Sequence, residues 1–444
     1  MEHAVQHTVQ HTSTLIPIVV FLIVYAAITF ELVNKAAATL AGVGVLVVLH
    51  VINEHQAVGF IDFETLMLLT GMMILVTLIK KSGFFTIVSV RIAEITKGSP
   101  VKILVLFSIV TALMSAFLDN VTTVLIIIPI IIELTRGLGL NPKNYVLSQA
   151  IISNIGGTAT LIGDPPNVII GSKVGLSFNQ FILTLSPIVI IVFVFVLAYI
   201  WFTHRVEFKP INTNMSKLVA VQLLLEKIRY EFSNITIDKK LMIKGLTCLT
   251  LAIFLFITQT ITGLAPGVVA LGMAMVLLII SKADVEEILE EVEWSTLLFF
   301  TGLFILVGAL EEYGVINWIA QNVFMNVGDN PYVLVLMVLW VAGIASGFLD
   351  NIPFTITMIP IIHLILESTP IPNNILWWAL ALGACFGGNI TMIGASANIV
   401  SVGIAKKYGV EISFIDFMKK GVIVTLISLT LASIFLVLYL NASL

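Results

Sequence analysis

Three acidic residues of the 444-residue chain lie inside long apolar segments: Asp119, Asp164 and Asp350. The chain has 26 Asp and Glu residues, so acids in such segments are the exception. Asp119 and Asp350 are each followed by an asparagine, Asn120 or Asn351, and then by a new apolar run. An ionisable side chain within a membrane is costly and by default indicates a functional site. These carboxylates can bind a proton or a cation; the alternative is that they only cap the helix that follows.

The composition places these acids in a membrane protein. Hydrophobic residues make up 59% of the chain and charged residues only 11%, whereas a soluble domain carries roughly 25% charged residues. This excludes a soluble enzyme, a nucleic-acid-binding protein and a disordered scaffold. Cys248 and Cys385 lie far apart in apolar stretches without the spacing of metal ligands. We therefore expect neither a disulfide framework nor a metal site.

Apolar runs of about 20 residues, the length that crosses a bilayer, predict an all-α polytopic protein with about ten transmembrane helices. Two further apolar stretches, 101–135 and 333–367, are each interrupted halfway by Leu-Asp-Asn. Each half is short for a full crossing, which favours two re-entrant hairpins with buried polar tips. Two full spans at each stretch is the alternative. The ten spans are expected near 14–31, 36–52, 64–80, 144–171, 178–203, 241–261, 266–281, 295–310, 375–405 and 413–440.

The basic residues predict the orientation. With an extracytoplasmic N-terminus, every one of the 22 Lys and Arg residues except Lys173 falls on the cytoplasmic side. This predicts a multi-pass protein of the cell inner (plasma) membrane with both termini extracytoplasmic, and it does not decide between hairpins and spans. The predicted segments are a polar outer tail, 1–13; a first repeat, 14–203; a cytoplasmic linker with an amphipathic helix, 204–240; and a second repeat, 241–444.

The chain matches itself at a constant shift of 231 residues, as from position 117 to 348. Phe-Leu-Asp-Asn ends at both Asn120 and Asn351, and Gly-Gly stands at both 156–157 and 387–388. Five full spans in each half, an odd number, predict that the two repeats enter the membrane in opposite orientation. Inverted repeats with interrupted helices are typical of secondary transporters; a channel is the alternative.

The Gly-Gly pairs mark a second set of helix breaks. Glycine permits unwinding, and the neighbouring Thr and Asn residues can hydrogen-bond a solute; the alternative is that the glycines serve close helix packing. No Lys or Arg is expected at the depth of the carboxylates, which favours a small neutral or cationic solute coupled to protons. His363 can relay a proton and Cys385 can bind a thiophilic solute, although packing explains both.

These motifs, Phe-Leu-Asp-Asn before an apolar run and Asn-Ile-Gly-Gly-Thr-Ala-Thr-Leu-Ile-Gly-Asp-Pro-Pro-Asn at 154–167, resemble those of the ArsB/NhaD group of the ion transporter superfamily. The resemblance covers essentially the whole chain. It implies two inverted repeats whose hairpin tips face the unwound segments and enclose the substrate. Asp119, Asp164 and Asp350 are then the proton-coupling candidates. The substrate-binding candidates are Asn120, Thr122, Thr123, Gly156, Gly157, Thr158, Thr160, Asn351, Thr355, Gly387, Gly388, Asn389 and Thr391.

The resemblance implies a transporter, not an enzyme, that exports arsenite or antimonite as neutral hydroxides in exchange for protons. The alternatives are a Na⁺/H⁺ antiporter of the NhaD type and an organic anion transporter. Dicarboxylate relatives carry a Ser-Asn-Thr signature that is not intact at 157–160 or 388–391, which disfavours organic anions. Expected partners are the inorganic solute, protons and membrane lipid, and the resemblance allows a cytosolic ATPase subunit and a homodimer. No cofactor and no nucleic acid is expected.

Overall fold

Every regular element that the structure describes is a helix, as the apolar runs predict. Nine helices in the described part of the chain are long and apolar enough to cross a membrane, and four shorter apolar helices accompany them. The chain is therefore an all-helical polytopic membrane protein. The predicted amphipathic helix of the linker lies outside the described residues. The computed structural model describes residues 2–30, 32–205, 237–324, 330–369, 371–372 and 374–443.

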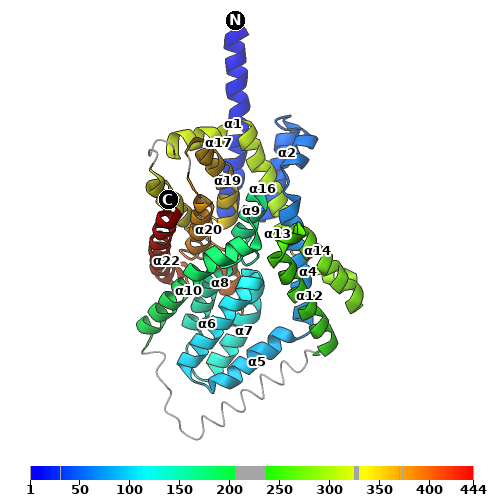
Figure 1. Ribbon diagram of the computed structural model, residues 1–444, viewed down its shortest axis with the longest axis vertical. Coiled ribbons are helices and arrows are strands. Elements are labelled where there is room, and N and C mark those ends of the chain that lie inside the picture. The colour runs from blue at the N-terminus through cyan, green and yellow to red at the C-terminus, as the bar shows by residue number, and fades with distance from the viewer. Residues whose placement is uncertain are drawn as a thin grey trace.

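The first half of the chain forms helices α1 to α10 (Figure 1). The predicted outer tail is helical from Glu2 on and continuous with the first helix. The bounds are α1 Glu2–Thr29, α2 Lys35–Val48, α3 Glu54–Phe60, α4 Phe63–Lys81, α5 Phe84–Thr96, α6 Pro100–Phe117, α7 Asn120–Gly137, α8 Pro142–Gly157, α9 Pro165–Val174 and α10 Phe178–Thr203.

The second half follows the same order. Its bounds are α12 Lys239–Ile257, α13 Gln259–Thr262, α14 Pro266–Ser281, α15 Val285–Glu290, α16 Trp294–Glu312, α17 Val315–Ile319, the short π-helix η1 Ala320–Phe324, α18 Pro331–Phe348, α19 Asn351–Ser368, α20 Ile375–Gly387, α21 Ser396–Lys407 and α22 Phe414–Ser443. The starts of α2, α4, α6, α7 and α9 recur 231 residues later in α14, α16, α18, α19 and α21. The opposite orientation of the two halves stays a prediction.

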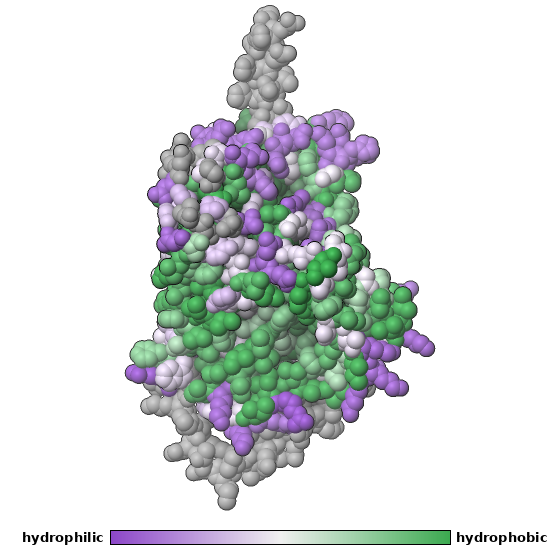
Figure 2. Space-filling view, viewed as in Figure 1, coloured by the Kyte–Doolittle hydropathy of each residue, from purple (hydrophilic) through white to green (hydrophobic). Residues whose placement is uncertain are grey.

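Both halves of each predicted hairpin, α6 with α7 and α18 with α19, are among the helices long enough to span. Length and composition therefore leave the choice between hairpins and full spans open. The face seen in Figure 2 has a broad apolar band between two hydrophilic ends. Large apolar side chains such as Ile190, Phe195 and Ile279 are exposed on the surface, as expected where lipid replaces water.

Two helix pairs, α4 with α14 and α2 with α16, pack closely at repeat-related glycines. A Cβ atom on Gly71 would lie 2.4 Å from the backbone carbon of Ala270, and one on Gly302 would lie 2.7 Å from Cβ of Thr39. Small residues permit such close approach, which is a common way for membrane helices to associate. These pairs form part of the framework around the interrupted helices.

We expect Gly71→Ala to destabilise the protein by about 1–3 kcal/mol, because the added methyl group meets backbone atoms that cannot give way. The matched control is Gly272→Ala in α14, where an added Cβ meets nothing within 4 Å. Thermal unfolding of the purified variants in detergent checks this. A Gly71→Ala protein as stable as the control would contradict the packing described.

Candidate functional site

Four helix interruptions meet at one small cavity of about 70 Å³. Two are the tips between α6 and α7 and between α18 and α19; the others separate α8 from α9 and α20 from α21. We call this space the inner cavity. Residues from all four interruptions line it, together with side chains of α4 and α16. The lining includes Asp119, Asn120, Asp164, Asn351, Ser396, Leu69, Met73, Glu293, Thr296 and Phe300.

Four of the predicted site residues therefore come together at the inner cavity: Asp119, Asn120, Asp164 and Asn351. Asp350 lies beside Asn351 at the same tip but does not line the cavity. The other predicted residues lie outside the lining of the cavity, and we list them together: Thr122, Thr123, Gly156, Gly157, Thr158, Thr160, Thr355, Gly387, Gly388, Asn389 and Thr391.

A row of buried asparagines connects the two halves behind the cavity. Nδ2 of Asn120 donates to Oδ1 of Asn154 at 3.3 Å. Nδ2 of Asn154 in turn donates to Oδ1 of Asn389 and of Asn398, each at 2.9 Å. Because Asn120 belongs to one hairpin tip and Asn389 to the opposite break, this row ties the interruptions to one another. The residues predicted from the sequence did not include Asn154, which begins the motif at 154–167, or Asn398.

The unwound segments are held by repeat-related side chains. Asn167 donates to the carbonyls of Thr158 and Thr160, and Asn398 donates to those of Gly388 and Thr391. The Thr391 hydroxyl also donates to the Gly347 carbonyl at 2.6 Å. In a membrane, broken helices persist only where other groups satisfy the freed carbonyls. The threonines of the breaks thus hold the backbone in this arrangement.

The glycine pairs permit close packing at the breaks. A Cβ on Gly156 would lie 2.4 Å from the carbonyl oxygen of Ala112 in α6, and one on Gly387 would lie 2.2 Å from that of Gly343 in α18. The alternative interpretation of these glycines as packing positions therefore describes what they do in this conformation. Their place in substrate binding stays a prediction.

Both tip carboxylates cap the helix that follows them, as the capping alternative required. Asp119 accepts from the amide and the hydroxyl of Thr122, and Asp350 accepts from the amide of Ile352 at 3.2 Å. Both carboxylates have further contacts besides the capping hydrogen bonds. Asp119 also faces the inner cavity, and Asp350 has a second partner.

That second partner is Lys35, whose Nζ lies 2.5 Å from Oδ2 of Asp350. The expectation that no basic residue reaches the carboxylates was wrong. Lys35 begins α2, and Oδ1 of the preceding Asn34 accepts from the Ser295 hydroxyl at 3.4 Å, which sets the start of α2 beside α16. The long lysine side chain can then extend into the protein. In the sequence, Lys35 is a single lysine between the first two predicted spans. The prediction of a span does not show how deep the side chain of a loop lysine reaches.

The two halves differ at this point. The residue 231 positions after Lys35 is Pro266, which cannot pair with a carboxylate. No ion pair involving Asp119 occurs among the described residues. Among the described residues, one tip carboxylate is thus neutralised by a lysine, and the other accepts hydrogen bonds from neutral donors only.

Three buried polar atoms near the site have no hydrogen-bond partner in the described part of the chain: Oδ2 of Asp164, Oγ1 of Thr123 and Nδ2 of Asn389. Asp164 is 1% exposed, and its other oxygen accepts from Nδ2 of Asn351 at 3.4 Å. An unpartnered buried polar atom costs roughly 1–3 kcal/mol and calls for an explanation such as a bound proton, ion or solute. All three residues were predicted site residues.

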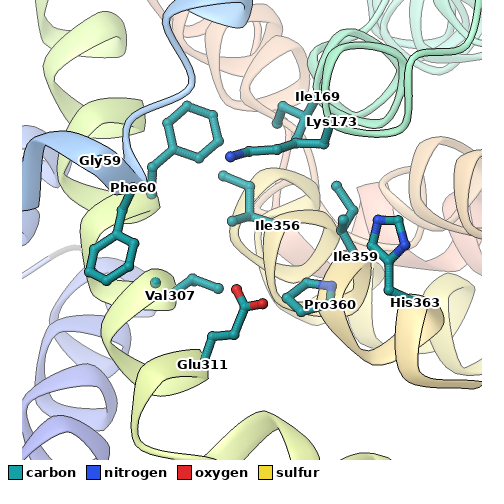
Figure 3. A pocket seen from close by; sticks show the side chains of 12 residues that line it. Gly59, Phe60, Ile169, Lys173, Val307, Glu311, Ile356, Ile359, Pro360 and His363 are labelled. Carbon is teal, nitrogen blue, oxygen red and sulfur yellow. The ribbon is translucent and has the colours of Figure 1, made fainter. Parts of the chain in front are cut away.

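A second, larger cavity of about 280 Å³ lies on the other side of an apolar layer. In Figure 3, Lys173 and Glu311 point into this outer cavity from opposite sides. Phe300 and Ile352 line the inner cavity, and Phe304 and Ile356, one helical turn further along α16 and α19, line the outer one. About one turn of each helix therefore separates the two cavities, a thickness of roughly 6 Å.

His363 and Cys385, for which the sequence allowed either a functional or a packing role, both have packing contacts. The His363 ring lies edge-on to Trp377 with centroids 4.9 Å apart, at the rim of the outer cavity. Cys385 is fully buried, with its Sγ 3.6 Å from Oδ1 of Asn167. Within the described residues, no three His, Cys, Asp or Glu side chains are placed to hold a metal ion.

Comparison with known proteins fits this architecture. The family model described as citrate transporter, CitMHS, matches residues 25–383. The chain is 41% identical to the 46 kDa membrane protein of Mycobacterium leprae (strain TN), over 95% of this chain and 98% of that protein. It is 39% identical to an uncharacterized transporter of Mycobacterium tuberculosis (strain ATCC 25618 / H37Rv), with the same coverage.

The P protein of Homo sapiens is 34% identical over 93% of this chain, which spans 58% of that protein. The family match covers well over half of the chain, and the relatives match it along almost its entire length. The finer resemblance to arsenite permeases is not what these matches show. The chain is a secondary transporter, not an enzyme, and it belongs to the CitMHS family of the ion transporter superfamily.

Proposed function

We propose that this transporter exchanges protons for a small neutral or cationic inorganic solute, and that arsenite or antimonite, as the neutral hydroxide, is that solute. The observation that carries the proposal is the lining of the inner cavity. It holds the carboxylates of Asp119, Asp164 and Glu293 with the amides of Asn120 and Asn351, and no basic residue lines it. Hydroxyl groups on a metalloid can donate to the carboxylates and accept from the amides.

The size and charge of the inner cavity favour this solute over an organic anion. At about 70 Å³ the inner cavity is smaller than the outer cavity of about 280 Å³, which favours a small solute. Three nearby carboxylates would repel the charges of a tricarboxylate. The family description names citrate, so citrate belongs in the test beside arsenite. Sodium belongs there too, because carboxylates and carbonyls also suit a cation.

Proton coupling is assigned mainly to Asp119 and Asp164. Lys35 already neutralises Asp350, whereas Asp164 keeps an oxygen without a partner in the described structure. Asp164 is buried, and burial disfavours the charged form of a carboxylate. Asp350 then serves chiefly to hold its tip against α2 through Lys35.

Alternating access follows from the same arrangement. The inner and outer cavities are separated by an apolar layer about one helical turn thick, so a modest movement of the interrupted helices against α4 and α16 would change access. We place ten spans and two re-entrant hairpins in two inverted repeats, in the inner membrane, with both termini extracytoplasmic. A cytosolic ATPase subunit and a homodimer remain expectations from the resemblance.

The function is tested with purified protein in proteoliposomes under an imposed pH gradient, with arsenite, sodium and citrate compared. We expect the pH gradient to drive arsenite movement and to leave citrate untouched. Empty liposomes are the control for passive leak. Proton movement with sodium but not with arsenite would show that the solute is sodium. Transport of citrate alone would contradict the proposal that the inner cavity binds a small neutral or cationic solute.

Asp119→Asn is expected to reduce proton-coupled transport at least about 10-fold, equivalent to roughly 1.4 kcal/mol. Asparagine keeps the helix cap but cannot carry the proton, so the variant should fold normally. Transport in proteoliposomes and thermal unfolding are measured together. If the variant folds and retains full proton-coupled transport, Asp119 only caps α7 and does not carry the proton.

Lys35→Met is expected to lower the free energy of unfolding by about 2 kcal/mol, because it leaves Asp350 buried without its charge partner. The loss should be smaller than the 3–5 kcal/mol typical of fully buried pairs, since the Lys35 side chain is 30% exposed. The double variant Lys35→Met, Asp350→Asn should recover most of the loss. Additive losses in thermal unfolding would show that the pair is not coupled.

A further inference from the structure

A third carboxylate of the inner cavity, Glu293, was absent from the residues predicted from the sequence. It directly precedes the apolar run of α16 and so does not stand out as an acid within a span. It occupies the N-cap position of α16, yet its side chain makes no capping hydrogen bond. In the described structure the Glu293 carboxylate accepts one hydrogen bond, from the Thr296 hydroxyl at 3.0 Å. Glu293 lines the inner cavity together with Asp119.

The repeat supplies a direct comparison, because Asp62 lies 231 residues earlier at the N-cap of α4. The Asp62 carboxylate accepts from the amides of Glu64 and Thr65 and from the hydroxyls of Thr65 and Ser172. The Asp62 carboxylate therefore holds local structure. Glu293, at the same position in the second half, has a side chain one methylene longer that makes no capping hydrogen bond.

The charged groups around Glu293 come from several elements. Asp119 precedes α7 and Asp164 precedes α9, and both face the same cavity. The Asp350–Lys35 pair lies beside the start of α16, where Asn34 meets Ser295. On the other side, two residues before Glu293, Glu291 pairs with Lys80 at 3.1 Å and with Lys81 at 3.4 Å. The final group is Glu287, which lies 2.7 Å from Lys81.

Glu293 thus stands between the inner cavity and a cluster of exposed ion pairs at the end of α4. The side chains of Lys80 and Glu291 are 47% and 35% exposed, so water reaches this cluster. The positive-inside pattern predicts that this end of α4 is cytoplasmic. A carboxylate in this position can receive a proton from the cavity on one side and release it toward water on the other.

We propose that Glu293 is the proton-exchange residue that connects Asp119 to the end of α4 carrying Lys80 and Lys81. The proposal rests on the proposed proton coupling and assigns its route. In the forward step the O–H bond of the Asp119 carboxyl breaks, and the proton binds the Glu293 carboxylate. Asp119 becomes the carboxylate, and Glu293 then loses the proton to water at the ion-pair cluster. The first step moves the negative charge from Glu293 to Asp119. The second step leaves both groups as carboxylates, because water takes up the proton.

The test compares Glu293→Gln with Asp62→Asn in the full-length protein. Glutamine keeps the size and the contact with Thr296 but has no titratable proton. The Asp62→Asn variant keeps a helix cap while losing a carboxylate at the repeat-related position, so it controls for the loss of a buried charge. Glu293→Asp keeps a carboxylate and is the conservative variant. Thermal unfolding establishes that each variant is folded.

Two readouts are used. A trapped pH dye in proteoliposomes reports proton flux with arsenite, sodium or citrate, whichever the wild type transports. Infrared titration of the carboxyl band in purified protein reports the proton affinity of Asp119, identified by its loss in Asp119→Asn, and needs no solute. We expect Glu293→Gln to cut proton flux at least about 10-fold and to change that affinity at least about 10-fold, with Asp62→Asn changing neither and Glu293→Asp retaining flux.

Unchanged proton affinity in Glu293→Gln, or unchanged proton flux in a transporting preparation, would overturn the role of Glu293. Equal effects of Asp62→Asn would overturn it as well, because they would reflect a general loss of buried charge. If none of the three solutes moves protons in the wild type, the proposed function fails, and the infrared titration alone decides whether Glu293 and Asp119 share a proton.

Discussion

The four helix interruptions leave backbone carbonyls and amides that cannot hydrogen-bond to lipid. Side chains from one interruption form hydrogen bonds with another, and these bonds shape the candidate site. Asn167 and Asn398 bond the carbonyls of the two unwound segments. Asn154 joins the halves through Asn389 and Asn398. Other polar groups of the interruptions, those of Asp119, Asn120, Asp164 and Asn351, face the inner cavity. The same interruptions thus supply both the hydrogen bonds that hold the backbone and the polar groups of the proposed site.

The proposed proton exchange depends on positions at which the two repeats differ. Lys35 pairs with Asp350, but its counterpart Pro266 leaves Asp119 without a basic partner among the described residues. The Asp62 carboxylate accepts from four donor groups, whereas the Glu293 carboxylate accepts a single hydrogen bond in the described part of the chain and faces the cavity. The tip at Asp350 is therefore fixed by a lysine, whereas the tip at Asp119 shares its cavity with other carboxylates. Such asymmetry allows the two tips to divide holding and proton exchange between them.

Much of the fold could be predicted from the sequence, because apolar runs report spans directly and polar interruptions report breaks. The cost of a buried charge also led to Asp119 and Asp164, and the asparagines that follow the tip carboxylates gave Asn120 and Asn351. Lys35 was missed because loop position does not reveal how deep a long side chain reaches. Glu293 was missed because it stands just before its helix. Which polar groups face the cavity and which hold the backbone depends on packing between distant segments, as with Thr391 and Gly347.

The most direct test of the central claim, that a carboxylate-lined cavity exchanges protons for a small solute, starts without any pH gradient. Proteoliposomes loaded with arsenite are diluted into arsenite-free buffer, and the internal pH is followed with a trapped dye. We expect arsenite leaving the vesicles to drive protons inward and acidify the interior, and a proton ionophore to abolish the change. Arsenite efflux with no change in internal pH would contradict proton exchange at this site.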